Sequence, residues 1–205
     1  LAKGGLHSKD DPRVIWANPG EALADPDVAS MYPSFIVNYG VSPHHLSSKV
    51  FLGIVEWLRT TRLDAKHNGR KLEADALKIV INRIYGALND AMDYLYDPEC
   101  TYTVTINLQL LLCNLIESFE LNGFDVLSAN TDGLLIRRPN DRLDLFNHIC
   151  KEWEDYSKLS LDTEVFEKYC RSAVNDYIAV GYGFYDALQE YNRCGVWIDS
   201  KGNTY

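Results

Sequence analysis

Residues 123–138, GFDVLSANTDGLLIRR, constrain the fold of this chain most strongly, because they read as an antiparallel hairpin. Two apolar segments, FDVLSA and LLIRR, are separated by Asn-Thr-Asp-Gly, residue types that favour tight turns. Asp132 lies at the tip of this hairpin. It is either a turn residue or a carboxylate that two buried strands hold in place to bind something. A second carboxylate elsewhere in the chain would favour the binding interpretation.

Most of the remaining chain reads as helices. Ser47 or Ser48 is suited to cap a helix that ends at 67, and Asn68-Gly69 is a typical helix stop. A second helix is predicted over 71–88, and the short link between the two requires an antiparallel pair. Further helices are predicted over 104–120 and 143–158, and a strand over 174–184. One antiparallel hairpin among irregularly spaced helices favours an α+β fold, with helices on one face of an antiparallel sheet.

Composition is that of an ordinary folded protein. The 205 residues are 46% hydrophobic, which is enough for a sizeable core. No run of 18 apolar residues occurs, so neither a membrane span nor a membrane partner is expected. The five cysteines include no C-x-x-C pair and the five histidines show no ligand spacing, which favours neither a zinc site nor disulfides. We expect a reduced, cytoplasmic protein and, because residue 1 is Leu, a fragment of a longer chain.

The net charge of −9 taken alone argues against a nucleic-acid-binding protein, whose footprint is usually basic. The charge is unevenly distributed, however. Residues 59–78 carry six Lys or Arg side chains against three acids, and the acids concentrate in segments such as KEWEDY and LDTEVFEKY. A local basic surface is therefore expected despite the acidic total.

Asp27 is the candidate partner of Asp132. It opens the segment DVASMYPS, whose apolar residues are suited to burial, so Asp27 is expected at a strand end. Two strand-end carboxylates that converge on one point repel each other unless a cation lies between them. Mg²⁺ suits such a site, because it takes a few carboxylate oxygens and completes its shell with water and phosphate oxygens. The alternative is that both aspartates serve only turns and strand ends.

The predicted helix pair bears on this choice. Lys78, Asn82 and Tyr85 share one helix face at i, i+4 and i+7, and the preceding helix carries a stripe of Arg59, Arg62 and Lys66. An antiparallel pair is able to turn both stripes towards one polyanionic ligand, such as a triphosphate. The alternative is that both stripes are solvated helix faces. Gly86 fits that alternative poorly, because glycine inside a helix costs about 1 kcal/mol relative to alanine.

Three segments in this order resemble motifs A, B and C of the family B (alpha-like) DNA polymerases. DVASMYPS (27–34) is similar to D-x-x-S-L-Y-P-S, KIVINRIYG (78–86) to K-x-x-x-N-S-x-Y-G, and NTDG (130–133) to D-T-D-S. Weaker similarity extends to KGGLHS (3–8), RLDAK (62–66) and NDYIAV (175–180). The phage or prophage branch of the family is the most similar.

The resemblance implies a polymerase palm with an antiparallel sheet and packed helices, interrupted by a two-helix fingers hairpin. It assigns 1–47 and 90–190 to the palm, 48–89 to the fingers and 191–205 to a palm–thumb junction. An exonuclease domain and most of a thumb would be other domains of the same polymerase. For a phage or prophage protein, the location would be the bacterial host cytoplasm.

The resemblance also implies roles for individual residues. Asp27 and Asp132 would be catalytic and hold two Mg²⁺ ions, or Mn²⁺ in their place, with the backbone carbonyl of Val28. An incoming dNTP would be bound by a set of seven residues: Arg62, Lys66, Lys78, Asn82, Tyr32, Tyr85 and Gly86. Within that set Tyr32 would exclude ribonucleotides, and Tyr85 and Gly86 would lie against the nascent base pair. Primer–template DNA would be contacted by Gly4, Gly5, Tyr177 and Lys201.

Four positions depart from the family pattern. Asn130 replaces the first acid of D-T-D, although Asp132 matches the essential second one. Gly133 replaces Ser, Arg83 replaces the Ser after Asn82, and Asn175 stands where a primer-gripping Lys is expected. These departures and the acidic net charge motivate a second hypothesis, a non-catalytic polymerase-like nucleic-acid-binding module. An unrelated two-carboxylate hydrolase is a third. Fifty residues lie between Asp27 and Lys78, which favours nucleic-acid over protein primers.

Overall fold

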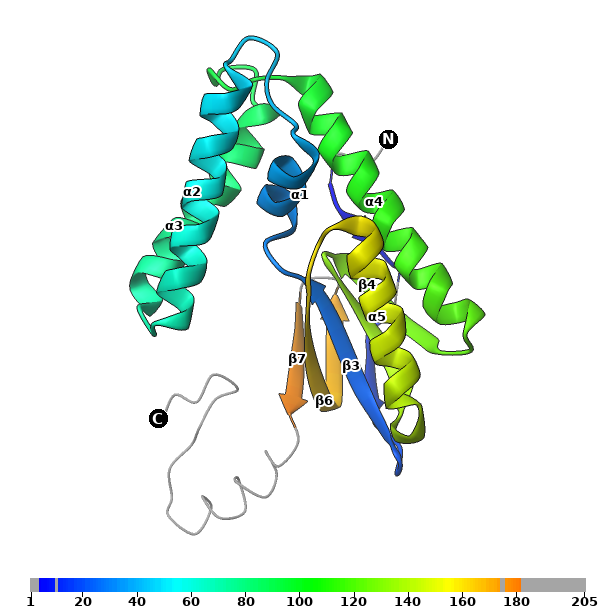
Figure 1. The fold of residues 1–205 in the computed structure, drawn as a ribbon. Helices are drawn as coiled ribbons and strands as arrows, with labels where there is room; N and C mark the ends of the chain where they lie inside the picture. Colours follow the sequence, from blue (N-terminus) through cyan, green and yellow to red (C-terminus); the bar gives the residue numbers. More distant parts are fainter. Residues whose placement is uncertain (1–3, 10, 174–175, 182–205) are drawn as a thin grey trace. The chain divides into compact units, whose positions relative to one another are not determined.

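The predicted hairpin is present and lies near the middle of an antiparallel sheet in the computed structural model, which describes residues 4–9, 11–173 and 176–181 (Figure 1). The chain divides into two units. Among the described residues, the sheet unit comprises 6–9, 11–27, 114–153, 161–173 and 176–181, and the helical unit comprises 4–5, 28–113 and 154–160.

The sheet unit contains seven described strands in the order β1-β4-β5-β3-β6-β2, with β7 paired to β6. Their bounds are β1 Leu6–His7, β2 Arg13–Trp16, β3 Glu21–Val28, β4 Asp125–Thr131, β5 Gly133–Pro139, β6 Leu161–Ala173 and β7 Asp176–Gly181. The register that matters for function pairs Asn130 with Gly133 across the hairpin, and Gly133 with Asp27 on β3. The segments that carry Asp27 and Asp132 therefore lie on neighbouring strands.

The two faces of this sheet differ because side chains alternate along each strand. One face carries buried Ala24, Leu134 and Ile136, and α5 (Leu143–Ser157) runs across it (Figure 1). Phe146 of α5 packs with Phe119 and Phe124, ring centroids 5.0 and 6.1 Å away. The opposite face carries a smaller core of Ile15, Leu23, Leu135 and Tyr169. Asp25 and Asp27 continue the Leu23 side of β3, and so belong to this second face.

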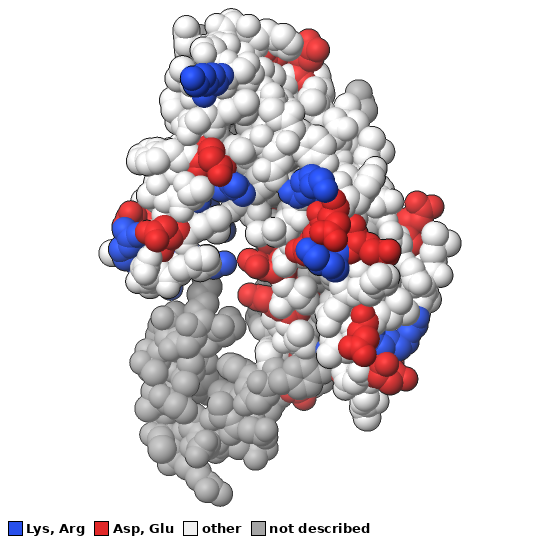
Figure 2. Space-filling view, in the orientation of Figure 1, with Lys and Arg blue, Asp and Glu red and all other residues white. Residues whose placement is uncertain are grey.

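The helical unit contains α1 (Met31–Tyr39), α2 (Ser48–His67), α3 (Lys71–Leu88) and the start of α4 (Pro98–Leu121). α2 and α3 run side by side (Figure 1), joined by residues 68–70. Val55, Leu58 and Ala65 of α2 and Ile81 and Leu88 of α3 are buried at helical spacing. At the end of this pair where residues 68–70 connect the two helices, Lys or Arg side chains lie beside Asp or Glu (Figure 2). This agrees with the ion pairs of Arg70 with Asp64 and Glu73.

The expected α+β architecture is confirmed, and the predicted ends of α2, α3 and α5 agree with the structure within a residue or two. The predicted start of α4 at 104 is wrong, since the helix begins at Pro98, where Asp97 accepts a hydrogen bond from the Cys100 backbone N–H at 3.1 Å. The strands β1, β2 and β6 were not predicted. In β6 charged residues are interspersed among apolar ones without a regular alternation, so the segment shows no clear strand period.

Helix α4 is the one helix in the described ranges that is long and apolar enough to cross a membrane, with a mean hydropathy of 1.2. A single helix of this kind is weak evidence for a membrane span, since core helices pass the same test. Val104, Leu108, Leu112, Leu115 and Phe119 of α4 are buried at helical spacing, which accounts for much of its apolar content.

Candidate nucleotidyl-transfer site

A small cavity of about 70 Å³ lies on the second face of the sheet, and both predicted catalytic aspartates line it. The lining comprises three acids, two polar residues, two tyrosines and two others: Asp25, Asp27, Asp132, Ser128, Asn130, Tyr169, Tyr177, Gly133 and Leu135. Every contributing segment is a strand or the β4–β5 turn. The site is therefore held by sheet register rather than by a long loop.

The β4–β5 connection is shorter than the four residues, Asn-Thr-Asp-Gly, that separate the two apolar segments in the sequence. Asn130 and Gly133 are paired strand residues, and the connection is only Thr131 and Asp132. Thr131 has φ 48°, a left-handed conformation that is unusual for a β-branched residue. Such strain is often found at functional sites. Here it turns the chain so that Asp132 lies at the cavity.

The backbone of Gly133 does not have a positive φ, so its conformation does not require glycine. The limited space around its Cα atom is the relevant constraint. A Cβ atom at this position would lie 3.1 Å from an Oδ1 oxygen of Asp25 and 3.1 Å from one of Asp27. Contacts this short require the neighbours to move. The serine that the family pattern has here would therefore require Asp25 and Asp27 to shift by a few tenths of an ångström.

Asp25 is a member of this site that the sequence analysis missed. Burial and, to a lesser extent, the nearby carboxylates of Glu164 and Asp132 together raise the pKa of Asp25 to about 7. A visible signal existed, because Asp25 and Asp27 in D-P-D are alternate residues of one strand and so share a face. Glu164 was also missed, since β6 itself was not predicted.

Tyr177, a predicted DNA contact, is in β7 and lines the same cavity. Its ring stacks on Tyr169, with centroids 4.8 Å apart. Burial raises the pKa of its hydroxyl, and Asp25, Asp27, Glu164 and Asp132 add to that effect. The four carboxylates thus converge on one small region beside this phenol. Asn175 and Lys201 lie outside the described residues.

The donor set of this cavity fits a divalent cation. Carboxylate, amide and hydroxyl oxygens are the ligands that Mg²⁺ and Mn²⁺ prefer. The Asn130 Oδ1 atom is buried and has no hydrogen-bond partner among the described residues. An oxygen of this kind, in a cavity lined by other oxygens, is suited to a cation or its water shell rather than to the neighbouring carboxylates.

The predicted nucleotide-binding residues are all in the helical unit. Tyr32 of α1 and Tyr85 of α3 stack face to face, with centroids 4.0 Å apart and an interplanar angle of 21°. The Tyr85 hydroxyl lies 2.6 Å from Thr105 Oγ1. Arg62 of α2 donates a hydrogen bond to Ser30 Oγ, one residue before α1. The segment 30–32 and the α2–α3 pair are thus joined by a ring stack and by one guanidinium group.

Lys66, Lys78, Asn82 and Gly86 lie at exposed positions of α2 and α3. No hydrogen bond or ion pair of Lys78 is found among the described residues. By contrast, Arg59 pairs with Glu56 at 2.9 Å, so its charge is already matched within α2. A Cβ atom at Gly86 would meet nothing within 4 Å, which leaves open space along that helix face. Gly4 accepts a hydrogen bond from the Gln109 side chain, and Gly5 is half-buried.

Two other features compete with this site and are explained without a ligand. His44, Asp97 and Cys100 lie close enough to hold a metal ion. However, Asp97 accepts hydrogen bonds from the His44 backbone N–H, the His44 ring and the Cys100 N–H, which is the pattern of a helix cap. Burial raises the pKa of the Cys100 thiol to about 11, with Asp97 adding to the effect, which disfavours a thiolate ligand.

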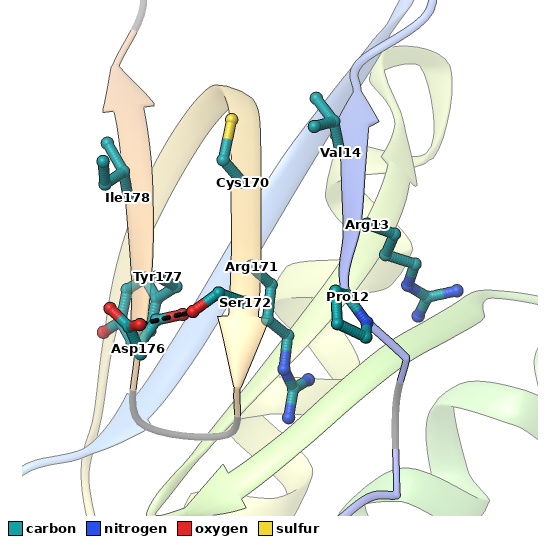
Figure 3. A pocket seen from close by; sticks show the side chains of 9 residues that line it. All are labelled: Pro12, Arg13, Val14, Cys170, Arg171, Ser172, Asp176, Tyr177 and Ile178. Carbon is teal, nitrogen blue, oxygen red and sulfur yellow. Dashed lines mark hydrogen bonds between the residues drawn. The ribbon is translucent and has the colours of Figure 1, made fainter.

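A larger groove of about 530 Å³ lies beside β2, β6 and β7 (Figure 3). Val14, Cys170 and Ile178 lie on one side of it, and Asp176 forms a hydrogen bond with Ser172. Arg13 donates to the Leu127 carbonyl oxygen and Arg171 to Ser128 Oγ, so both guanidinium groups bond within the sheet unit. This groove is mainly apolar and does not gather a set of catalytic side chains.

Several known DNA polymerases are similar to this chain in sequence. No protein-family model matches the chain. Over 190 residues it is 27% identical to a DNA polymerase of Thermococcus gorgonarius, covering 77% of this chain and 24% of that protein. Over 155 residues it is 26% identical to DNA polymerase II of Escherichia coli K12, covering 63% of this chain and 20% of that protein.

The fold is similar to the structure of the family B DNA polymerase from Pyrobaculum calidifontis, with a TM-score of 0.57 and 17% identity. That similarity covers 87% of this chain and 29% of the other. The chain thus spans about a quarter of the length of the curated relatives that it matches. Over this fragment, and at low identity, the chain is similar in sequence to these DNA polymerases, and its fold is similar to that of a family B DNA polymerase.

Proposed function

We propose that this chain is part of a template-directed DNA polymerase that transfers a nucleotide from a dNTP to a primer 3′-hydroxyl. The observation that carries the proposal is one cavity lined by Asp27 from the end of β3 and Asp132 from the β4–β5 turn. The order of the three motifs and the homology to DNA polymerases support it. The phage or prophage branch of the family is part of the proposal.

In the proposed reaction the primer 3′-oxygen forms a bond to the α-phosphorus of the dNTP. The bond from that phosphorus to the bridging oxygen breaks, pyrophosphate leaves, and the hydroxyl proton passes to solvent. Asp27 and Asp132, with the carbonyl oxygen of Val28, would hold two Mg²⁺ or Mn²⁺ ions. When bound, such ions lower the pKa of the attacking hydroxyl and stabilise charge on the leaving group. The protein's part is positioning and electrostatics.

The helical unit is proposed to bind the dNTP. Lys78 would bind the triphosphate with Arg62, Asn82 and Lys66. The Lys78 ammonium group has no hydrogen bond or ion pair among the described residues, and charged groups of this kind bind phosphate oxygens well. The stacked pair of Tyr32 and Tyr85 offers an aromatic surface to sugar and base. Gly86 leaves that helix face open for a close approach of the ligand.

The domain roles are also proposals. Residues 1–47 and 90–190 would serve as palm, 48–89 as fingers, and 191–205 as the junction to a thumb. Gly4, Gly5, Tyr177 and Lys201 would contact primer–template DNA. Thumb and exonuclease domains would be partners within the same polymerase, in line with the quarter of the relatives' length that this chain spans.

A second candidate is a non-catalytic nucleic-acid-binding module. It is favoured by Asn130, which puts an uncharged residue where the family pattern has an acid, and by the net charge of −9. Such a module would bind duplex DNA with an affinity that falls steeply with salt. It would not extend a primer at any magnesium concentration.

The deciding experiment is primer extension by the natural protein that carries this sequence, with Mg²⁺ and with EDTA. We expect Mg²⁺-dependent extension that Asp27→Asn abolishes while primer–template binding is retained. The matched control is Asp125→Asn, an exposed acid at the other end of β4. Undiminished extension by the Asp27→Asn protein would refute the proposed role, and salt-sensitive DNA binding without any extension would favour the second candidate.

A further inference from the structure

The cavity contains one acid that neither the motif pattern nor the two-aspartate proposal uses. Asp25 precedes Asp27 by two residues on β3, so both side chains leave the strand on the same face. Both line the cavity, together with Asp132. No hydrogen bond to the Asp25 carboxylate is found among the described residues.

The position of Asp25 relative to Asp27 follows from Gly133. An Oδ1 oxygen of each acid lies 3.1 Å from the point where a Cβ atom of residue 133 would be. The two oxygens are therefore no more than 6.2 Å apart. Two divalent ions about 3.5–4 Å apart, each with ligands at about 2 Å, span a group of carboxylates of this size.

Asn130 supplies the second, independent observation. It is paired with Gly133 across the hairpin, and its buried Oδ1 has no partner among the described residues. It lines the same cavity as Asp25. An amide oxygen contributes a ligand without a charge, so a site built from Asn130, Asp27 and Asp132 has one negative charge fewer than the family pattern.

We infer that Asp25 supplies this missing charge as a third carboxylate of the divalent-cation site, and that Gly133 is glycine because Asp25 and Asp27 together fill the space of a side chain there. The inference rests on the proposed function, since it assigns one more ligand to the same site. It makes two measurable statements, one about cation affinity and one about packing.

Cation affinity is tested by titrating the chain with Mn²⁺ alone and following free Mn²⁺ by electron paramagnetic resonance. We expect Asp25→Asn to weaken binding by about 10- to 100-fold, the scale for losing an interaction that supports a metal site. Asp125→Asn should leave the affinity unchanged. Because the cavity loses a charge with Asp25→Asn and regains one with Asn130→Asp, the double variant should recover most of the affinity.

The possible results separate this inference from the proposed function. If Asp27→Asn weakens Mn²⁺ binding and Asp25→Asn does not, the role of Asp25 is refuted while the proposed function stands. If neither variant changes the affinity, or if the unchanged chain binds no Mn²⁺, both are refuted. Far-ultraviolet circular dichroism of each variant shows whether the fold is retained.

The packing statement is tested without any metal, by urea unfolding in EDTA. Gly133→Ser should lower the midpoint of unfolding, because the new side chain would meet Asp25 and Asp27. The same substitution in an Asp25→Ala background should lower the midpoint less, since one of the two neighbours is then absent. Equal shifts in both backgrounds would refute the packing of Asp25 against residue 133.

Discussion

Asp25 and Asp97 are two largely buried carboxylates in different units, and their surroundings are opposite. Asp97 accepts hydrogen bonds from His44 and Cys100, and these donors hold its pKa well below the usual range. Burial raises the pKa of Asp25 to about 7, and its charged neighbours are themselves acids. Ionised Asp97 is thus stabilised by its surroundings, whereas ionised Asp25 is opposed by them. An acid kept in unfavourable surroundings is a sign of function, and one surrounded by donors is a sign of structure.

The same contrast distinguishes basic side chains within the helical unit. Arg83, whose role the sequence left open, pairs with Asp93 at 2.8 Å and Asp90 at 3.4 Å and holds the turn after α3. Lys78, five residues earlier on the same helix, has no such partner among the described residues. The difference indicates that Arg83 stabilises the fold and that Lys78 is available to bind a ligand. Substitutions at the two positions test this assignment.

The largest effect is expected from Asp132→Asn, which removes a charge from the acidic cavity. Nucleotide addition by the natural protein should fall by roughly a thousand-fold, the upper scale for losing one electrostatic group at a reacting centre. Stability should not fall, because Asp132 is one of the acids that oppose ionised Asp25. Single-turnover extension and urea unfolding in EDTA measure the two quantities. If the variant lost stability as well as activity, Asp132 would be an acid that stabilises the fold, like Asp97, and the proposed difference between the two sites would be contradicted.

Lys78→Ala is expected to have the next largest effect. The KM for dNTP should rise by about 10- to 100-fold, since a charged contact to phosphate contributes about 1.5–3 kcal/mol. Stability should be unchanged, because no protein partner is lost. Arg83→Ala is the matched control on α3: it should leave the KM unchanged and cost at most about 1 kcal/mol, as expected for an exposed ion pair. Equal KM values for the two variants would remove the distinction between them.

Tyr32→Ala should lower discrimination against ribonucleotides by about ten-fold or more, on the scale of 1.4 kcal/mol per factor of ten. The ring of Tyr32 is stacked on Tyr85 and so is held in one orientation. Tyr32→Phe keeps the ring and should keep the discrimination. The ratio of kcat/KM for dATP and ATP measures the effect, and an unchanged ratio in Tyr32→Ala would exclude Tyr32 as the steric gate.

Asp97→Ala tests the structural side of the comparison. The variant should lose about 1–2 kcal/mol of stability, the scale for a helix N-cap, while kcat per folded molecule stays unchanged. Because its pKa is lowered, Asp97 stabilises the fold above about pH 4, and this is lost as the pH falls through its folded pKa. The pKa of His44 is raised, chiefly by its hydrogen bond to Asp97, so its contribution is present below about pH 6.5 and is lost as the pH rises.

Urea unfolding at pH 3, 5.5 and 8 tests the pH range between about 4 and 6.5, in which both charges are present. The stability difference between the unchanged chain and Asp97→Ala should be greatest at pH 5.5. His44→Ala is the companion variant and should reduce the change between pH 5.5 and 8. A difference that is flat from pH 3 to pH 8 would show that the cap does not depend on these charges.

Local sequence signals predicted α2, α3, α5 and the central hairpin well, whereas α1 was not predicted as a helix and α4 begins earlier than predicted. The ends of α2 and the start of α3 lie where Ser47, Asn68 and Gly69 predicted them, although the Ser47 side chain makes no capping hydrogen bond. The order of the motifs predicted that Asp27 and Asp132 share a site, and both line one cavity. The roles of Asp25 and Gly133 depend on the β3–β5 register, and that of Arg83 on the turn at 90–93. The alternation in D-P-D puts Asp25 on the same face as Asp27, but no local pattern encodes the pairing of β3 with β5 or that of Arg83 with Asp93.

The smallest expected effect, Gly86→Ala, separates stability from function at one position. A Cβ atom there would meet nothing within 4 Å, so alanine should fit and raise stability by about 0.5–1 kcal/mol through its higher helix propensity. If the open face is reserved for a ligand, nucleotide addition should fall several-fold although the fold is more stable. Ala76→Gly, at an exposed position of the same helix, is the reciprocal control and should cost stability without changing activity. A Gly86→Ala protein that is both more stable and fully active would show that the glycine is not kept for ligand approach.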